Sequence, residues 1–134
     1  MSTAKAKSKT LRHFRDLEVY QMAFDSAMKI FKMTRDFPVE ERYSITNQIR
    51  RSSRSVCSSI SEAWRKRKYE AYFRNKLTDA MSEASETQTW FDFCLACEYI
   101  DRELYEEMDK TYETIIAKLN AMERRAESFC FQSS

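Results

Sequence analysis

Residues 69–99 read YEAYFRNKLTDAMSEASETQTWFDFCLACEY, and this stretch decides the fold. Apolar or small side chains recur in it at alternating spacings of four and three residues: Phe73, Leu77, Ala80, Ala84, Thr87, Phe91 and Cys94. Such a spacing puts the side chains on one face of an α-helix. Met81, Gln88 and Leu95 widen the stripe, as expected for a helix packed in a bundle. The pattern predicts a long helix over residues 69–99.

The same spacing occurs upstream of this stretch. One stripe consists of Leu17, Tyr20, Phe24, Ala27, Phe31 and Thr34. We expect Asp16 to be the N-cap of this helix and Phe37-Pro38 to end it, because the residue before a proline is disfavoured in helical geometry.

A further helix is expected from about residue 40 to about residue 67. Its stripe consists of Ile45, Ile49, Ser52, Val56, Ser59, Ile60 and Ala63. Serine is a mediocre helix former, so the many serines around this stripe need a reason. Small side chains allow close approach of another helix, and their hydroxyls can bond to carbonyls of the preceding turn.

The last helix is expected to begin after Asp101 as its N-cap. Its stripe consists of Leu104, Met108, Thr111, Ile115, Leu119, Met122 and Ala126. Four helices with short connections predict an all-α protein, an antiparallel up-down-up-down four-helix bundle with left-handed packing. We assign residues 14–128 to the bundle, residues 1–13 to a disordered basic arm and residues 129–134 to a short tail. The apolar Phe129-Cys130-Phe131 either folds back on the bundle or docks on a neighbour.

The composition excludes several classes of site. The chain of 134 residues has no glycine and one proline, so glycine-rich phosphate loops and nucleophile elbows are ruled out. The single histidine, His13, lies outside the periodic segments and is interpreted as a solvated linker residue. Because helical-bundle metal sites use histidine with carboxylates, we expect no metal and no cofactor.

Four cysteines raise the question of compartment. The first fifteen residues are polar and basic, and no stretch is apolar enough to span a membrane, so we expect a cytoplasmic protein with reduced thiols and no membrane partner. Cys94-x-x-Cys97 is similar to a redox motif, yet no strand precedes it. Small residues of the core or a groove are the favoured interpretation, and redox chemistry is the alternative.

Charge is distributed unevenly although the net charge is only +2. Residues 42–68 hold eight basic side chains against Glu62 alone, and residues 79–113 hold eleven acidic side chains against two basic ones. Part of this charge can be neutralised between helices, since Arg50 or Arg51 could reach Glu83 or Glu86. The opposite signs also suggest that the basic face of one copy meets the acidic face of the next, which closes into a ring when the rotation permits.

The basic residues exceed what neutralisation requires, and they form our candidate nucleic-acid-binding set: Arg50, Arg51, Arg54, Arg65, Lys66, Arg67 and Lys68. Arg50 and Arg54 share a helix face, while Arg51 is rotated by about 100°. Four aromatic residues flank the second cluster: Trp64, Tyr69, Tyr72 and Phe73. They either cap the core or stack on unpaired bases.

Three spaced motifs resemble a known family. They are Phe14-Arg-Asp-Leu17-Glu-Val19-Tyr20-Gln21-x-Ala23; Phe37-Pro38 followed by Tyr43-x-Ile45-x-x-Gln48-Ile49-Arg50-Arg51-x-x-x-Ser55-Val56-x-x-x-Ile60-x-Glu62; and Tyr72-Phe73-x-x-Lys76-Leu77-x-Asp79-Ala80-x-x-Glu83-x-x-Glu86-Thr87-x-x-Trp90, ending in Glu98-Tyr99-Ile100. They are similar to those of the four-helix-bundle family first noticed in intervening sequences of bacterial large-subunit rRNA genes, over about residues 14–120. The usual Glu-Gly of that family is Glu62-Ala63 here, which implies a longer second helix.

The resemblance implies a cytosolic, non-enzymatic bundle that assembles as a homopentameric ring. A related branch comprises the accessory variability determinants of diversity-generating retroelements, strongly basic pentamers that bind nucleic acid and a reverse transcriptase. Polar residues in the motifs are candidates for contacts between helices: Gln48, Glu62, Glu83 and Glu86.

Three hypotheses of function follow. The leading one is a ring-forming bundle that binds structured RNA or DNA through the second helix and the arm. The second is a protein-binding scaffold, or an accessory subunit such as that of a reverse transcriptase, whose arginines serve assembly. An enzyme built on Glu62, Glu83 and Glu86 is the third and least favoured, because these carboxylates have no histidine partner and no obvious pocket.

Overall fold

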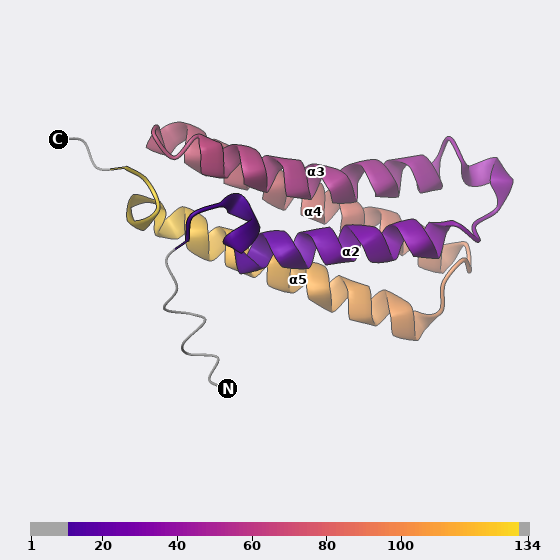
Figure 1. Ribbon diagram of the computed structural model, residues 1–134. Coiled ribbons are helices and arrows are strands. Elements are labelled where there is room, and N and C mark those ends of the chain that lie inside the picture. Colours follow the sequence, from indigo (N-terminus) through magenta and orange to yellow (C-terminus); the bar gives the residue numbers. More distant parts are fainter. Residues whose placement is uncertain (1–10, 132–134) are drawn as a thin grey trace.

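The computed structural model describes residues 11–131, and within them the chain is all-helical without strands. The four long helices are α2 (Glu18–Thr34), α3 (Ile45–Arg65), α4 (Glu70–Ala96) and α5 (Arg102–Arg124). Three short 3₁₀ turns flank them, η1 (Phe14–Asp16), η2 (Val39–Glu41) and η3 (Ala126–Ser128). Successive helices run in opposite directions, so the expected antiparallel bundle is confirmed (Figure 1). The arm at residues 1–10 and the last three residues of the tail lie outside the described part.

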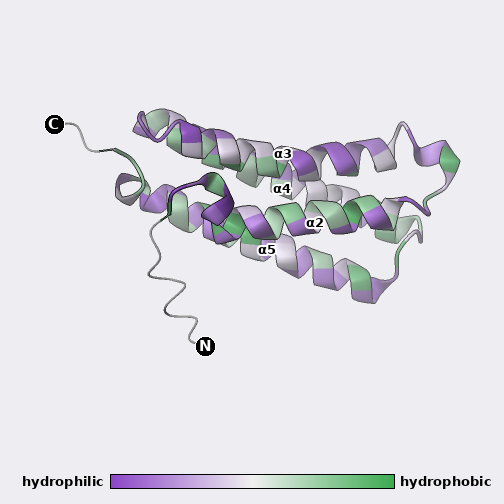
Figure 2. Ribbon diagram, in the orientation of Figure 1, coloured by the Kyte–Doolittle hydropathy of each residue, from purple (hydrophilic) through white to green (hydrophobic). Residues whose placement is uncertain are grey.

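The core follows the predicted stripes of α3 and α4 closely. Every stripe residue of α4 from Phe73 to Cys94 is buried, and so is every stripe residue of α3 from Ile45 to Ala63. These two helices pack on each other, α4 packs on α5, and α2 closes the bundle against α3 and α5. Green and purple residues alternate along the helices in Figure 2, as expected for helices with one buried face.

Some of the serines of α3 allow close helix packing or bond to carbonyls of the preceding turn, as the sequence predicts. Ser52, Ser53 and Ser59 are buried, where their small size lets the neighbouring helix approach. The hydroxyls of Ser53, Ser58 and Ser61 donate to carbonyls three residues earlier. The continuation of α3 through the buried Ala63 to Arg65 confirms the longer helix inferred from the missing glycine. The helix nevertheless begins only at Ile45, because η2 and a turn precede it.

The predicted stripe of α2 is wrong at its aromatic positions. Phe24 is 48% exposed, and Tyr20 and Phe31 are only half-buried. The helix instead turns a face of smaller residues to the core: Val19, Ala23, Ser26, Ala27, Ile30 and Thr34. Small side chains let α2 lie close to its neighbours, and this leaves the larger rings at the edge of the interface.

The start of α2 also differs from the prediction. Asp16 does not cap this helix, which begins at Glu18 after Leu17. The carboxylate of Asp16 instead accepts from the backbone N–H groups of Arg12 and His13, each at 3.0 Å. His13 is the N-cap of η1 and accepts from the backbone N–H of Arg15, so it is not the solvated linker residue expected.

The N-cap of α5 is confirmed, since the Asp101 carboxylate accepts from the backbone N–H of Leu104 at 2.8 Å. The stripe of this helix is correct except near its middle and its start. Thr111 and Leu104 are half-buried, while Tyr112, outside the predicted stripe, is fully buried. Tyr112 packs beside Phe91 with ring centroids 6.4 Å apart.

The turn between α4 and α5 forms without glycine. Glu98 has a φ of 62°, in the left-handed region. Its backbone N–H donates to Leu95 O and that of Tyr99 donates to Cys94 O, both at 2.9 Å. This pair of bonds is the Schellman motif that ends many helices, with glutamate in the position usually taken by glycine.

The tail folds back on its own bundle as far as the structure describes it. Phe129 stacks on the core residue Phe73 with centroids 5.8 Å apart, and the backbone N–H of Phe131 donates to Arg67 O at 3.3 Å. Both described ends of the chain therefore lie at the same end of the bundle as the α3–α4 turn (Figure 1).

Candidate nucleic-acid interface

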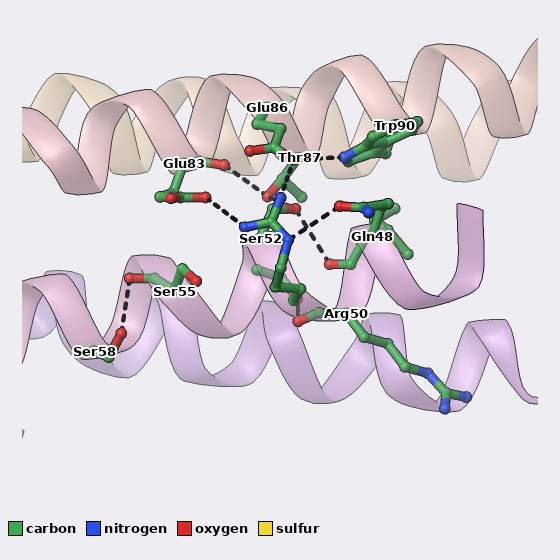
Figure 3. A network of polar contacts seen from close by, with 12 residues as sticks. Gln48, Arg50, Ser52, Ser55, Ser58, Glu83, Glu86, Thr87 and Trp90 are labelled. Atoms are coloured by element: carbon green, nitrogen blue, oxygen red, sulfur yellow. Dashed lines mark hydrogen bonds and ion pairs between the residues drawn. The ribbon is translucent and has the colours of Figure 1, made fainter. Parts of the chain in front are cut away.

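Arg50 and Arg51 of α3 point in different directions, as their spacing predicts. Arg51 contacts Glu83 of α4. Arg50 instead points toward α2 and away from the labelled carboxylates of α4 (Figure 3). Consecutive residues on a helix differ by about 100°, so neighbouring arginines reach different partners. The candidate nucleic-acid-binding set therefore divides into arginines bound within the bundle and arginines that face outward.

Arg51 is committed to contacts between α3 and α4. Its guanidinium forms ion pairs with Glu83, at 3.4 Å, and with Glu86, as anticipated for this pair of helices. Its Nε donates to Gln48 Oε1 at 3.0 Å, and Glu86 also accepts from the indole N–H of Trp90 at 3.0 Å. These contacts use both carboxylates and most of the donors of Arg51, which leaves Arg51 little capacity for an external anion.

A buried polar contact continues this network into the core. The hydroxyls of Ser52 and Thr87 lie 2.8 Å apart, and both residues are fully buried (Figure 3). Ser52 belongs to α3 and Thr87 to α4, so the hydrogen bond fixes the register of the two helices. Glu83 and Glu86 thus make the polar contacts between helices that their motifs suggested, and Glu62 makes another, since it pairs with Lys76 of α4 at 2.7 Å. Gln48 instead accepts from Arg51 of its own helix.

Arg50 belongs to a cluster of like charges around Phe31. Its Nε donates to Thr34 Oγ1 at 2.8 Å, and its guanidinium carbon lies 4.8 Å from the Phe31 ring centroid. The guanidinium carbons of Arg54 and Arg35 lie 5.8 and 5.2 Å from the same centroid. Burial, followed by the positive charges of Arg54 and Arg35, lowers the pKa of Arg50. The local field is therefore positive, which favours an anion.

An open pocket of about 630 Å³ lies beside this cluster, along the outer face of the N-terminal half of α3. Its lining residues are Arg42, Tyr43, Thr46, Asn47, Arg50, Arg51, Arg54, Ser55 and Ser58. We call this site the arginine pocket. Four of its lining residues are arginines and none is a carboxylate. Arg42, Arg50 and Arg54 form no ion pair with any carboxylate in the described part of the chain.

Sequence reasoning missed two members of the arginine pocket. Arg42 and Tyr43 precede α3 and lie in the turn after η2, not in the helix that was expected to begin at about residue 40. Tyr43 is 86% exposed. The only available signal was that the basic run of the sequence begins at Arg42.

The second basic cluster, at the end of α3, also divides into two kinds of residue. Arg67 is structural: its guanidinium carbon lies 3.5 Å from the Trp64 ring centroid, and its Nε donates to Trp64 O at 2.9 Å. Arg65, Lys66 and Lys68 are exposed, with no ion pair among residues 11–131.

Two carboxylates close in sequence to this cluster, Glu62 and Glu70, have cationic partners. Glu70 pairs with Arg74 at 3.0 Å, and Glu62 pairs with Lys76. Arg74 also pairs with Glu123 at 2.9 Å. The charges of Arg65, Lys66 and Lys68 are therefore available to a ligand.

The four aromatic residues near this cluster also divide into two kinds, buried and exposed. Trp64 and Phe73 are buried in the core, as the first interpretation expected. Tyr69 and Tyr72 are each 55% exposed, and their rings meet edge to face with centroids 5.7 Å apart. Lys66 Nζ lies 5.3 Å from the Tyr72 centroid, and Lys68 Nζ lies 5.7 Å from that of Tyr69.

The cysteines do not resemble a redox pair. Cys94 is buried in α4, and burial, followed by the charges of Cys97 and Glu41, raises its pKa to about 12. A reactive cysteine requires a lowered pKa, so Cys94 is a core residue as predicted. Cys97 is exposed at the end of α4 and does not share that role. All four cysteines of the chain are free thiols.

The described residues hold neither a metal-ligating cluster nor a membrane-spanning helix. Among residues 11–131, no three His, Cys, Asp or Glu side chains are grouped so that they could hold a metal ion. None of the helices in this range is long and apolar enough to cross a membrane.

The fold and this surface define a class, that of antiparallel four-helix bundles with an arginine-rich outer face. The chain belongs to the 23S rRNA-intervening sequence protein family, whose model matches residues 15–121. It is also similar to the crystal structure of a protein with unknown function from the S23 ribosomal protein family of Bacteroides thetaiotaomicron VPI-5482. The two are 30% identical with a TM-score of 0.72, over 79% of this chain and 95% of the other. No curated protein matches the chain.

Proposed function

We propose that this protein is a non-enzymatic nucleic-acid-binding protein of the cytoplasm, and that the arginine pocket contacts phosphates. The supporting observation is that the pocket is lined by four arginines without a carboxylate. Three of them, Arg42, Arg50 and Arg54, have no anionic partner in the described part of the chain. Such a group of cations repels itself, and a phosphate backbone relieves the repulsion while it releases counterions.

The test is a fluorescence-anisotropy titration of structured RNA and of duplex DNA, repeated from low to high salt. We expect log affinity to fall linearly with log salt, by about 0.9 per neutralised phosphate on duplex DNA. The double variant Arg42→Gln/Arg54→Gln should reduce that slope by about 1.8 if each arginine contacts one phosphate. Neither side chain makes a hydrogen bond within the described residues, so the fold is expected to survive.

Arg102→Gln is the matched control. Arg102 is an exposed arginine at the start of α5, outside the arginine pocket, and its substitution should leave the slope unchanged. Absence of binding near physiological salt, or an equal loss in the control and the double variant, would contradict the proposal.

A second candidate function, a self-assembling scaffold, is favoured by the outer face of α2. Phe24 and Met28 are one helical turn apart and are 48% and 41% exposed, so they form a small apolar patch on this face. The assembly that we propose is a homopentamer of five 16.0 kDa chains, in which the basic face of one chain meets the acidic face of the next. Sedimentation velocity at low and high salt tests this, and a monomer at every salt concentration would contradict it.

A reverse transcriptase is a further proposed partner, because the chain resembles the accessory variability determinants. Its test is co-purification of the two proteins with the wild type and with Arg42→Gln/Arg54→Gln. Equal recovery with both would place the polymerase on another surface, and no recovery with either would contradict this partner.

A further inference from the structure

The second basic cluster lies at a corner that combines positive charge with accessible aromatic rings. We use the name α3–α4 corner for Arg65, Lys66, Lys68, Tyr69 and Tyr72. Its two tyrosine rings are more than half exposed, and its three cations have no ion pair within residues 11–131. The corner therefore offers the two kinds of group that bind unpaired nucleotides, cations for the backbone and ring faces for the bases.

Helix α3 connects the arginine pocket to the α3–α4 corner, because Arg54 of the pocket and Arg65 of the corner both belong to it. Arg54 and Arg65 are eleven residues apart on α3, which corresponds to about 16 Å along the helix axis. The surface between them is polar and small, with Ser58 exposed and Ser61 half-buried. A second open pocket of about 280 Å³, lined in part by Ser61, Arg65 and Lys66, continues the path.

The one carboxylate on this path is neutralised within the protein. Glu62 also lines the second pocket, and it pairs with Lys76 at 2.7 Å. Contact with Glu62 in turn raises the pKa of Lys76, so the pair is stable in its charged form. A phosphate backbone along α3 therefore meets uncompensated positive charge at both ends and no free negative charge between them.

From this arrangement we infer that the ligand is a single strand, RNA or DNA, whose backbone follows α3 from the arginine pocket to the α3–α4 corner and whose unpaired bases stack on Tyr69 and Tyr72. This inference rests on the proposed nucleic-acid binding and narrows it to strands with unpaired bases. The distance of about 16 Å corresponds to at most about five nucleotides, because 3.4 Å is the spacing along one strand of a stacked duplex and an unstacked strand is more extended. In a duplex the bases are already stacked on each other, so their faces cannot reach the tyrosine rings.

The experiment measures the anisotropy of fluorescein-labelled single strands of roughly 12 nucleotides, longer than the five-nucleotide path, made as RNA and as DNA of one sequence. The duplex formed with the complement is measured in parallel. The full chain is compared with Tyr69→Leu/Tyr72→Leu, which removes the ring faces but keeps apolar bulk. Thermal melting checks that the fold is intact.

We expect the double variant to lose at least about fivefold in single-strand affinity, because stacking of one base contributes roughly a factor of 5 to 150. Its duplex affinity should not change. Whichever strand binds tighter identifies RNA or DNA as the ligand. Phe93→Leu is the matched control, since Phe93 is 50% exposed on the same helix near its other end, and it should bind like the wild type.

Two outcomes overturn the inference and can be told apart. If the wild type binds single strand and duplex but the tyrosine variant binds both as well as the wild type does, nucleic-acid binding stands and stacking fails. If the wild type binds neither, the proposed function fails together with this inference. Vesicles of phosphatidylglycerol are an additional probe. Binding to them that is lost in the tyrosine variant, with strand affinity unchanged, would identify the corner as a membrane contact instead.

Discussion

Removal of the Tyr112 hydroxyl should make the protein more stable. Tyr112 Oη is buried in the core and has no hydrogen-bond partner within the described residues. Burial also raises the pKa of this phenol, with a smaller contribution from Cys57, so the group stays neutral. The substitution Tyr112→Phe keeps the ring packed beside Phe91 and removes only the unpaired oxygen.

Two opposing effects determine the magnitude. An unpaired buried hydroxyl costs about 1–3 kcal/mol in the free energy of unfolding. Its removal leaves a gap of roughly 10 Å³, which at about 24 cal/mol per Å³ costs about 0.2 kcal/mol. The desolvation effect is larger, so Tyr112→Phe should raise the free energy of unfolding by about 1–3 kcal/mol.

Urea denaturation followed by circular dichroism measures this change. With a slope near 2 kcal/mol per molar urea, the middle of the usual range of about 1–3, the midpoint should rise by about 0.5–1.5 M without a change in slope. Tyr105→Phe is the matched control, because the Tyr105 hydroxyl donates to Asp92 Oδ1 at 2.6 Å and its loss should lower the midpoint slightly. A lower midpoint for Tyr112→Phe would refute the reasoning, since it would show that the hydroxyl has a stabilising partner.

Three other predictions concern stability. Glu98→Gly should raise the melting temperature by about 2–4 °C, because glycine takes the left-handed conformation at φ 62° without the cost that glutamate bears; an unchanged or lower value would contradict this. Ser52→Ala and Thr87→Val should each lower the free energy of unfolding by about 1–2 kcal/mol, and the double variant should lower it by less than the sum of the two. Strict additivity in urea titrations would mean that the 2.8 Å contact is not a coupled hydrogen bond. Stability should be full below about pH 9 and should fall between pH 9 and 12. The folded protein raises the pKa of Cys94 from 9.0 and that of Tyr105 from 10.0, each to about 12, so the unfolded chain loses these protons first. Melting temperatures that stay constant over this range would contradict this prediction.

The sequence predicted the interior helices better than the first helix, and the reason is physical. Helix α4 is long and presents only one continuous apolar stripe, so the period alone identifies its buried face. Helix α2 carries two candidate stripes, one aromatic and one of small residues. Which of the two stripes is buried depends on how closely α3 and α5 approach α2, and this distance is set by the tertiary packing. Phe24 was therefore assigned to the core although Ala23 occupies it.

The candidate site was predictable in its charge and its helix faces but not in its partners. Spacing separated Arg50 from Arg51, and the structure places Arg51 with Glu83 and Glu86 of α4. The lack of an ion pair at Arg42 and Arg54 could not be inferred, because it depends on which carboxylates the fold brings near. The structural role of Arg67 likewise depends on its packing over Trp64.

The cysteines at the α4–α5 turn have a practical consequence for spectroscopy. Cys57 and Cys94 are buried with raised pKa values, and Cys130 is half-buried, also with a raised pKa, so a thiol-reactive dye at neutral pH should attach at the exposed Cys97. This turn is at the opposite end of the bundle from the α3–α4 turn and from both described ends of the chain (Figure 1). A fluorophore there would report on rotational diffusion and on energy transfer from a labelled strand without occupying the α3–α4 corner. The wild-type chain can therefore be labelled at a single position without engineered cysteines.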